Sequence, residues 1–397
     1  MKDLAGRLNS FVRDLPPSGI REFFDLVIGM DDVISLGVGE PDFSTPWDIC
    51  DAAIAGMREG ITSYTSNAGL MELREAISCD MCERYGVQYS AEKEILTTVG
   101  VSEGLDLVMR AVLDPGDEVI VPEPTYVSYM PSVELAGGKA VGVQTREEDE
   151  FKLTAEALEA CITPCTKALL VGYPNNPTGA TMSREELLPI AEVCVKHDLI
   201  VFSDEIYSHL TYEGEHACIA SLPGMYERTV VFNGFSKAYA MTGWRLGYAC
   251  GPVPIVDAMN RIHAYTALCA PVSAQLGAIE ALRHGEADMR RMVAEYDQRR
   301  RLFVQGLNDI GLSCFVPKGA FYTFPKVSQF GLSSKEFSRR LLFEEKVAAV
   351  PGTAFGACGE GHIRCTYATS MENLKLALER MAAFVGRLHK ERGAETA

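Results

Sequence analysis

The sequence predicts an α/β fold, with a three-layer αβα large domain built on a mostly parallel sheet and a smaller α+β domain. From about residue 94 to 250, short β-rich runs alternate with helical patterns. Several of these runs are apolar at consecutive positions, as expected for strands buried on both faces of a parallel sheet. A long helical stretch then leads into short strands and a last helix, which indicates the second domain.

Each element follows from a local pattern. Six runs are the expected strands of the large sheet: EILTTVG, DEVIVPEP, KALLVGYP, LIVFSDE, TVVFNGFS and LGYACGP. Between them, SREELLPIAEVCVKHD predicts a crossover helix with Ser183 as its N-cap. Farther along, FYTFPKV, VAAVPGTAF and HIRCTY predict the strands of the smaller domain. The last helix is expected to place five apolar residues on one face: Leu374, Leu378, Met381, Val385 and Leu388.

The chain is expected to divide into three parts. Residues 1–18 would form an N-terminal arm, residues 19–48 and 291–397 the smaller domain, and residues 49–290 the large domain. The segment through VISLGVGEPDF is therefore expected to complete the smaller domain, although it precedes the large one in the chain.

Composition excludes several classes of partner. The net charge of −17 (37 basic and 54 acidic residues) argues against nucleic acid and anionic membrane surfaces, since both need a basic face. No apolar run approaches the roughly 20 residues of a membrane span, and the opening lacks the apolar core of a signal peptide, so we expect a cytoplasmic protein. The twelve cysteines are expected to be reduced thiols. The close pairs Cys79/Cys82 and Cys161/Cys165 lack the further ligands of a zinc site, so no metal is expected.

Polar residues follow successive predicted strands. In open parallel sheets, ligands bind outside the carboxyl ends of the strands, so these side chains are expected to meet in one cleft. Taken singly, each has an ordinary interpretation, because NNPTG is a common turn, Ser102 and Asp204 are common capping residues, and Tyr126 is a common core residue. The whole set comprises Val101, Ser102, Tyr126, Asn176, Asp204, Tyr207, Ser236 and Lys237.

This set suits one kind of ligand. A helix N-terminus, a hydroxyl and Arg245 together form a phosphate site. Asp204 suits a cationic ring nitrogen, where an ion pair at ~4 Å is worth ~4 kcal/mol at an effective dielectric of ~20. A tyrosine face stacks on an aromatic ring, and Lys237 suits imine formation with an aldehyde. A phosphate, a pyridinium and an aldehyde describe pyridoxal phosphate.

Eight motifs carry a resemblance to a known family. They are ISLGVGEPDF, YTSNAGLMELREAI, GVSEGL, YPNNPTG, SDEIY, NGFSKAYAMTGWRLGY, VPGTAFG and HIRCTYA. In this order and spacing, the chain resembles the class I/II aminotransferases of the fold type I pyridoxal-phosphate enzymes, from about Gly19 to the last helix. GVSEGL and PTYVSYMP look most like the branch that contains bacterial and archaeal aspartate and aromatic aminotransferases.

The resemblance implies a role for each residue around the cofactor ring. Lys237 matches the lysine that holds pyridoxal 5′-phosphate as a Schiff base and then, once free, moves the proton between the substrate Cα and the cofactor. Asp204 matches the aspartate that keeps the ring nitrogen protonated. Asn176 and Tyr207 match donors to the ring's 3′ oxygen, and Tyr126 matches the aromatic residue that stacks on the ring. Lys237, Asp204 and Tyr207 are therefore the predicted catalytic residues.

The resemblance also implies the phosphate and substrate contacts. For the phosphate, the matching residues are Val101, Ser102, Ser236, Arg245 and, from the neighbouring subunit, Tyr64. This implies a homodimer with shared active sites. For the substrate, Arg364 matches the arginine that binds the α-carboxylate, with Gly39 and Asn176 beside it. One position departs from the family pattern, because Gly234 stands where many relatives carry a phosphate-binding serine, and Ser236 is the expected replacement.

The resemblance implies an aminotransferase that moves an amino group between an L-amino acid (aspartate, aromatic or related) and a 2-oxo acid such as 2-oxoglutarate, in a ping-pong reaction through the Lys237 Schiff base. A β-lyase acting on C–S bonds is the alternative on the same fold. A cofactor-binding regulator is a remote alternative, because it would need a DNA-binding segment ahead of Gly19, and residues 1–18 are expected to leave no room for one. A nucleotide-binding dehydrogenase is disfavoured, since GVGEPD lacks the last glycine of a dinucleotide fingerprint. Arg13, Arg21 and Arg261 are all conceivable as a second cation for an acidic side chain.

Overall fold

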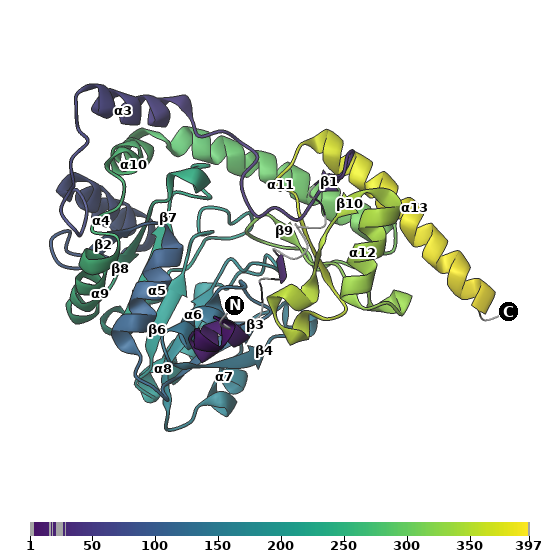
Figure 1. The fold of residues 1–397 in the computed structure, drawn as a ribbon, viewed down its shortest axis with the longest axis horizontal. Coiled ribbons are helices and arrows are strands. Elements are labelled where there is room, and N and C mark those ends of the chain that lie inside the picture. Colours follow the sequence, from purple (N-terminus) through teal and green to yellow (C-terminus); the bar gives the residue numbers. More distant parts are fainter. Residues whose placement is uncertain (1–3, 16, 18, 21–26, 28, 396–397) are drawn as a thin grey trace.

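The body of the protein is a three-layer α/β unit. The computed structural model describes residues 4–15, 17, 19–20, 27 and 29–395. Its seven-stranded sheet has the order β2-β8-β7-β6-β5-β3-β4, and in it only β8 runs against its neighbours, as the prediction of a mostly parallel sheet requires (Figure 1). The strands are β2 (Ile95–Thr98), β3 (Glu118–Glu123), β4 (Lys139–Gln144), β5 (Thr166–Gly172), β6 (Ile200–Asp204), β7 (Thr229–Gly234) and β8 (Gly247–Cys250).

All six predicted strands of this sheet are present, and β4 is an addition that the pattern did not predict. β4 lies at the edge of the sheet and pairs only with β3. Most of its residues are exposed or half-buried, and Gly142 interrupts its apolar character. An edge strand has one strand neighbour only, so it does not need the continuous apolar run by which the central strands were recognised.

Helices cover both faces of the sheet. Alternate strand residues point to opposite faces, so Val119 and Val121 pack on one side and Ile120 on the other. The first face is covered by α5 (Val101–Val112), α6 (Tyr129–Leu135) and α9 (Val253–Thr266). The second face is covered by α4 (Met71–Tyr85), α7 (Ala155–Cys161), α8 (Arg184–Lys196) and α10 (Val272–His284). The predicted three-layer architecture is therefore confirmed.

Helix α8 shows how the sequence fixes an element's start. Ser183 Oγ accepts a hydrogen bond from the Glu186 amide, and the Glu186 carboxylate accepts one from the Ser183 amide at 2.8 Å. This capping box satisfies two amides that have no partner inside the helix. The predicted N-cap at Ser183 is confirmed.

A smaller α+β part adjoins the large sheet. Its three-stranded antiparallel sheet has the order β11-β12-β9, and a parallel pair joins β1 to β10. The pairing of β1 with β10 shows that the segment containing Ile34 folds with residues more than 300 positions later in the chain. The strands are β1 (Ile34–Ser35), β9 (Tyr322–Thr323), β10 (Val347–Ala348), β11 (Val350–Pro351) and β12 (Ile363–Thr366).

Helices α11 (Glu286–Asp309), α12 (Ser334–Glu345) and α13 (Met371–Glu395) complete this part. The predicted apolar face of the last helix is confirmed, because four of its five residues are buried and Leu378 packs against the same core. Helix α11 passes through residue 291, where we predict a domain boundary, and runs along both parts of the molecule (Figure 1). The division into domains stays a prediction.

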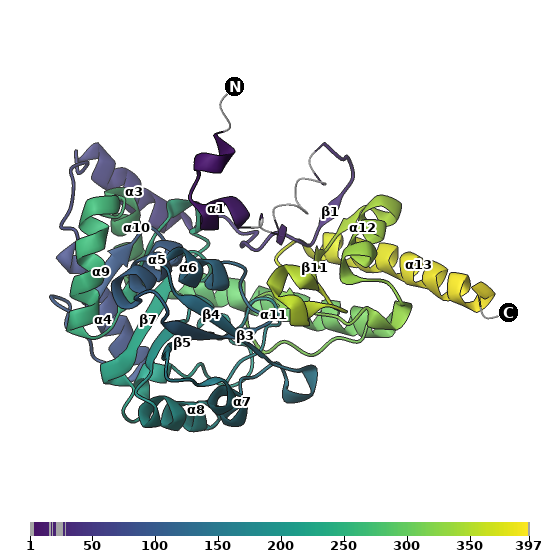
Figure 2. The same ribbon diagram turned by 60° about the horizontal axis from the view of Figure 1, so that its bottom comes forward.

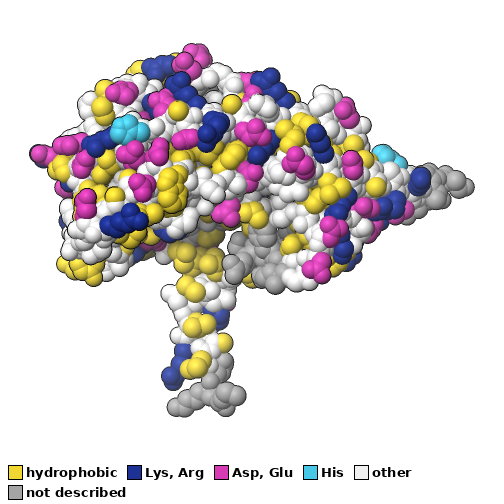
Figure 3. All heavy atoms as spheres, turned by 90° about the horizontal axis from the view of Figure 1, so that it is seen from above, with side chains coloured by type: hydrophobic (Ala, Val, Ile, Leu, Met, Phe, Trp, Pro, Cys, Tyr) yellow, Lys and Arg dark blue, Asp and Glu magenta, His cyan; other side chains and the backbone are white. Residues whose placement is uncertain are grey.

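The remaining helices are short or peripheral. α3 (Trp47–Arg58) packs on α10, and α1 (Ser10–Asp14) stands off the body together with residues 4–9 (Figures 2 and 3). None of the helices in the described part of the chain is long and apolar enough to cross a membrane. The 3₁₀ helices are η1 (Ala5–Arg7), η2 (Glu147–Asp149), η3 (Ile219–Ser221), η4 (Tyr226–Arg228), η5 (Thr242–Trp244), η6 (Ser328–Phe330), η7 (Gly352–Phe355) and η8 (Ala357–Gly359).

Candidate active site

A cavity of about 900 Å³ lies at the carboxyl ends of the parallel strands, between the large sheet and the smaller part. Its position is the one that an open parallel sheet favours for ligands. All the predicted site residues except Tyr64 line it: Gly39, Val101, Ser102, Tyr126, Asn176, Asp204, Tyr207, Ser236, Lys237, Arg245 and Arg364. The fold thus brings together residues that lie more than 300 positions apart in the chain.

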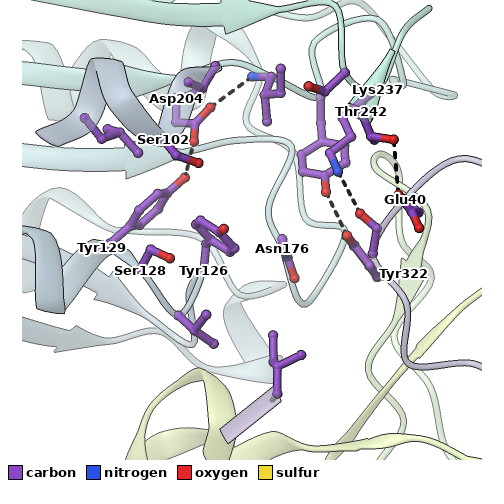
Figure 4. A pocket seen from close by; sticks show the side chains of 18 of the residues that line it. Glu40, Ser102, Tyr126, Ser128, Tyr129, Asn176, Asp204, Lys237, Thr242 and Tyr322 are labelled. Carbon is purple, nitrogen blue, oxygen red and sulfur yellow. Dashed lines mark hydrogen bonds between the residues drawn. The ribbon is translucent and has the colours of Figure 1, made fainter. Parts of the chain in front are cut away.

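Lys237 lies in a turn after β7. After it the chain continues through turns into the three-residue η5. Its Nζ donates a hydrogen bond to the Gly39 carbonyl at 2.7 Å (Figure 4). Burial lowers the pKa of Lys237 to about 8; Glu40 and Asp204 oppose this shift, and the cations Arg364 and Arg245 add to it. An amine with this pKa is partly neutral near pH 7, as a nucleophile or proton acceptor must be.

Asp204 ends strand β6 and is 5% exposed. Its Oδ2 accepts a hydrogen bond from the Tyr129 hydroxyl at 2.8 Å, and its Oδ1 accepts one from the Ile206 amide at 3.1 Å (Figure 4). Burial raises the pKa of Asp204 to about 6, although both hydrogen bonds act to lower it. No basic side chain of the described residues forms an ion pair with it, so a cationic ligand group would find an unpaired buried acid here.

Tyr129 is a site residue that the sequence did not reveal. It begins α6, three residues after Tyr126, and its ring meets the Tyr126 ring edge to face at 5.5 Å. The two tyrosines in PTYVSYMP were a visible signal of an aromatic cluster. Only the placement of α6 against the end of β6 shows that the second hydroxyl turns toward Asp204.

Arg364 on β12 is 1% exposed. Its guanidinium donates to Asn176 Oδ1 at 2.9 Å and to the Gly37 carbonyl at 2.5 Å, and it lies over the Tyr322 ring at 4.5 Å. Burial lowers its pKa, and no carboxylate within the described ranges pairs with it. Burying a cation without an anion beside it costs free energy. A ligand carboxylate that pairs with Arg364 would offset this cost.

Tyr207 and Tyr322 both line the cavity and are in contact with each other. Their hydroxyl oxygens are 2.7 Å apart, and both rings are buried (Figure 4). A side chain at Gly39 would place its Cβ 2.6 Å from the Tyr322 hydroxyl, so the glycine is needed for this approach. Sequence reasoning assigned Tyr207 but missed Tyr322, which the pattern FYTFPKV marked only as part of a strand.

The phosphate end is built from glycines, a helix start and an arginine. Helix α5 begins at Val101 after Gly100, whose φ is +75°, and no described side chain caps its first amides. A Cβ at Gly100 would lie 2.6 Å from Arg245 Nη2, and one at Gly247 would lie 2.6 Å from the Val101 nitrogen. The glycines therefore let the guanidinium and the free amides converge, as an anion site requires.

Gly234 departs from the family pattern for a steric reason. A Cβ there would lie 2.9 Å from the Gly247 Cα and 3.0 Å from the Leu246 carbonyl oxygen. A serine at this position has no room while β7 and β8 keep this spacing. Ser236 lines the cavity, and its role as the replacement stays a prediction.

Glu103 holds the loop that precedes α5 through hydrogen bonds. Its carboxylate accepts from the Val99 amide at 2.5 Å and lies 2.9 Å from His263 Nδ1 on α9. The His263 side chain is fully buried, and its Nε2 has no hydrogen-bond partner among the described residues. The loop that leads into the helix is thus held through two side chains from α5 and α9.

Some candidate residues lie away from the cavity. Tyr64 is 81% exposed, Arg13 on α1 pairs with Asp14, and Arg261 on α9 is exposed. Arg21 lies outside the described residues. Among the described lining side chains, Lys237, Arg245 and Arg364 are the cations, and Glu40 is an acid that the sequence did not single out.

Known proteins share this fold, and about half of their residues are identical over nearly the whole of this chain. The family model for class I and II aminotransferases matches residues 31–381. The putative aminotransferase YugH of Bacillus subtilis is 54% identical and is aligned over 96% of this chain and 98% of its own. An aspartate aminotransferase of Pyrococcus abyssi is 47% identical over 92% of this chain and 95% of its own. The crystal structure of an aromatic aminotransferase from Pyrococcus horikoshii superposes with a TM-score of 0.88 at 45% identity, covering 94% of this chain and 99% of that one.

Proposed function

The chain belongs to the class I and II aminotransferase family, and from this premise we propose which residues carry the reaction and which amino acids it accepts. As a member, it is a transaminase that depends on pyridoxal 5′-phosphate. One observation carries the assignment of residues. The same cavity holds an amine of lowered pKa, a buried acid and a buried arginine, and neither of the last two has an ion-pair partner in the part of the chain that the structure describes.

The lining fits the cofactor. Arg245 and the amides at the start of α5 would hold its phosphate, because the glycine cradle leaves them free and close together. Asp204 would pair with the protonated ring nitrogen, Tyr126 would stack on the ring, and Lys237 would bind the aldehyde carbon. When bound, pyridoxal phosphate supplies an electron-withdrawing ring conjugated to the amino acid Cα.

Lys237 would move the proton. As a free amine, its Nζ would accept the proton from the substrate Cα and would return it at the reacting carbon of the cofactor. Burial and the nearby cations favour the neutral amine that this step needs. Asp204, in its anionic form, would favour the protonated ring throughout, and the Tyr129 hydroxyl would hold its carboxylate in place.

Arg364 would bind the α-carboxylate of the substrate. Its guanidinium is held by Asn176 and the Gly37 carbonyl, which leaves a defined direction for a carboxylate. Because it is buried, the pair would be only weakly screened by salt.

The substrate side chain would meet mainly apolar surface. Ile20, Val38 and Val127 line the cavity, and the three cations among its described lining residues all have proposed roles at other groups. We therefore propose an aromatic or related substrate as readily as aspartate, with a 2-oxo acid such as 2-oxoglutarate as the exchange partner.

We also propose a homodimer with shared active sites. Tyr64 is exposed here, and it would reach the phosphate of a neighbouring subunit. The N-terminal segment that stands off the body carries exposed Leu4, Leu8 and Val12, a surface suited to a second copy (Figure 3). All twelve cysteines are free thiols, which supports the proposed cytoplasmic location.

A half-reaction screen tests the function. The cofactor-loaded protein is mixed with one amino acid at a time, and the spectrum of the bound cofactor is followed. Conversion to the amine form without ammonia release, strongest with aromatic amino acids, glutamate or aspartate, is the expected result. Release of pyruvate and ammonia from cysteine-like substrates would instead favour the β-lyase.

A further inference from the structure

Tyr322 on β9 connects two groups to which separate roles are proposed. Its hydroxyl lies 2.7 Å from the Tyr207 hydroxyl (Figure 4). Its ring faces the Arg364 guanidinium at 4.5 Å. It is fully buried, and Gly39 leaves room for its hydroxyl. One side chain therefore touches both the proposed donor to the cofactor's ring oxygen and the proposed carboxylate site.

The direction of the hydrogen bond follows from counting protons. Each phenol carries one proton, so a Tyr207 that donates to the ring oxygen has only its lone pairs left for Tyr322. Tyr322 must then be the donor to Tyr207. Arg364 favours this direction, because a cation facing the phenol makes it more acidic and so a stronger donor. Burial raises the pKa of Tyr322, and Arg364 opposes that rise.

We propose that Tyr322 is a positioning residue whose hydroxyl directs the Tyr207 proton toward the cofactor's ring oxygen and whose ring holds Arg364 for the substrate carboxylate. The proposal rests on the proposed function, in which Arg364 binds the substrate carboxylate, and on the role of ring-oxygen donor that the family resemblance implies for Tyr207. Donor chains of this kind strengthen each member, because each hydrogen bond polarises the next. The two tasks use different parts of the side chain, so they can be separated by substitution.

Tyr322→Phe removes the hydroxyl and keeps the ring. A weaker Tyr207 donor stabilises the anionic ring oxygen less, so the pH midpoint of the bound cofactor's visible absorbance should rise by about half a unit to one unit. Maleate serves as the probe of the carboxylate site. Its dissociation constant, followed by the same absorbance at a pH well away from the midpoint, should change less than about twofold. Tyr322→Leu removes both parts and should also weaken maleate binding by about fivefold or more.

Tyr207→Phe is the matched control, and it should raise the midpoint at least as far as Tyr322→Phe does. The double variant should then show no shift beyond that of Tyr207→Phe, because the relay ends at Tyr207. If Tyr207→Phe shifts the midpoint and Tyr322→Phe leaves or lowers it, the relay is wrong while the function proposed for Tyr207 stands. If Tyr207→Phe causes no shift, that proposed function fails, and the relay fails with it.

Melting temperatures of the cofactor-free variants show whether folding is intact. Tyr322→Phe should melt close to the unchanged chain, since it loses one oxygen and keeps its packing. An unchanged maleate affinity in Tyr322→Leu, in a protein that melts normally, would overturn the part of the proposal that concerns Arg364.

Discussion

The two ends of the cavity differ in their contact with water. At the ring end, Asp204 is 5% and Arg364 1% exposed, whereas Ser102 and Arg245 at the phosphate end are exposed. Burial at the ring end raises the pKa of Asp204 and lowers that of Lys237. At the ring end, where water is excluded, burial thus changes the proton affinities of Asp204 and Lys237. At the open phosphate end, the helix amides and the charged Arg245 are available to an anion. Ligand binding at the ring end should therefore depend on pH and on the loss of single hydroxyl or carboxylate groups. Ligand binding at the phosphate end should depend on salt concentration.

The largest effect is expected from removing the amine at the buried end. Lys237→Ala should lower turnover by about 10⁴-fold, because the proton acceptor and the covalent attachment point are both lost. Borohydride treatment of the loaded protein, followed by mass spectrometry, should attach the cofactor to the unchanged chain and not to the variant. Lys237→Arg is the control that keeps a cation. A trapped adduct in either variant would place the attachment at another residue.

The next effect concerns the buried acid. Asp204→Asn should lower turnover by about 10³-fold, since an ion pair with the ring nitrogen is worth ~4 kcal/mol at an effective dielectric of ~20. The pKa of Asp204 is raised to about 6, so below that pH the carboxyl is neutral and cannot pair with a cation. Pyridoxal is the ligand of choice because it has no phosphate, so no phosphate titration overlaps with that of Asp204. The affinity for pyridoxal should therefore fall as pH drops through about 6.

Tyr129→Phe sharpens the same measurement. The Tyr129 hydrogen bond lowers the pKa of Asp204, so its loss should move the midpoint of pyridoxal binding to higher pH. Asp204→Asn should show no step in this range. A step that persists in Asp204→Asn would belong to another group, and the ring end would then be tuned differently.

The contrast between the two ends also marks what the sequence could predict. Groups that end strands, such as Asp204 and Lys237, were found because parallel strands deliver their carboxyl ends to one edge. Tyr129 and Tyr322 were missed, because their hydroxyls turn into the site through the packing of α6 and β9, which no local pattern encodes. The edge strand β4 was missed because most of its residues are exposed or half-buried and it has no continuous apolar run. Local patterns therefore predicted the sheet and its ends, and contacts between distant segments supplied the rest.

A smaller effect is expected at the open end. Arg245→Ala should weaken pyridoxal phosphate binding by about tenfold, because the helix amides and Ser236 remain. Affinity of the unchanged chain should fall as salt rises, since exposed charges are screened beyond about 8–10 Å at physiological ionic strength. Spectroscopic titration of the cofactor-free protein at two salt concentrations gives both numbers, with Arg261→Ala as a control on a distant exposed arginine. An equal salt dependence in the unchanged chain and Arg245→Ala would show that this end does not rely on the guanidinium.

The smallest effect tests whether phosphate binding at the open end of the cavity also depends on the buried side chain of His263. His263 is fully buried and lies 2.9 Å from the Glu103 carboxylate, which in turn accepts from the Val99 amide ahead of α5. His263→Leu leaves that carboxylate oxygen without this partner and frees Glu103 to move, a loss of about 1 kcal/mol or about fivefold in affinity. Because the loop from Val99 presents the amides to the phosphate, the loss should appear with pyridoxal phosphate and not with pyridoxal. The ratio of the two dissociation constants is therefore the measurement, and it cancels any general loosening of the cavity. Equal weakening of both ligands would mean that His263 supports the core and not the phosphate end.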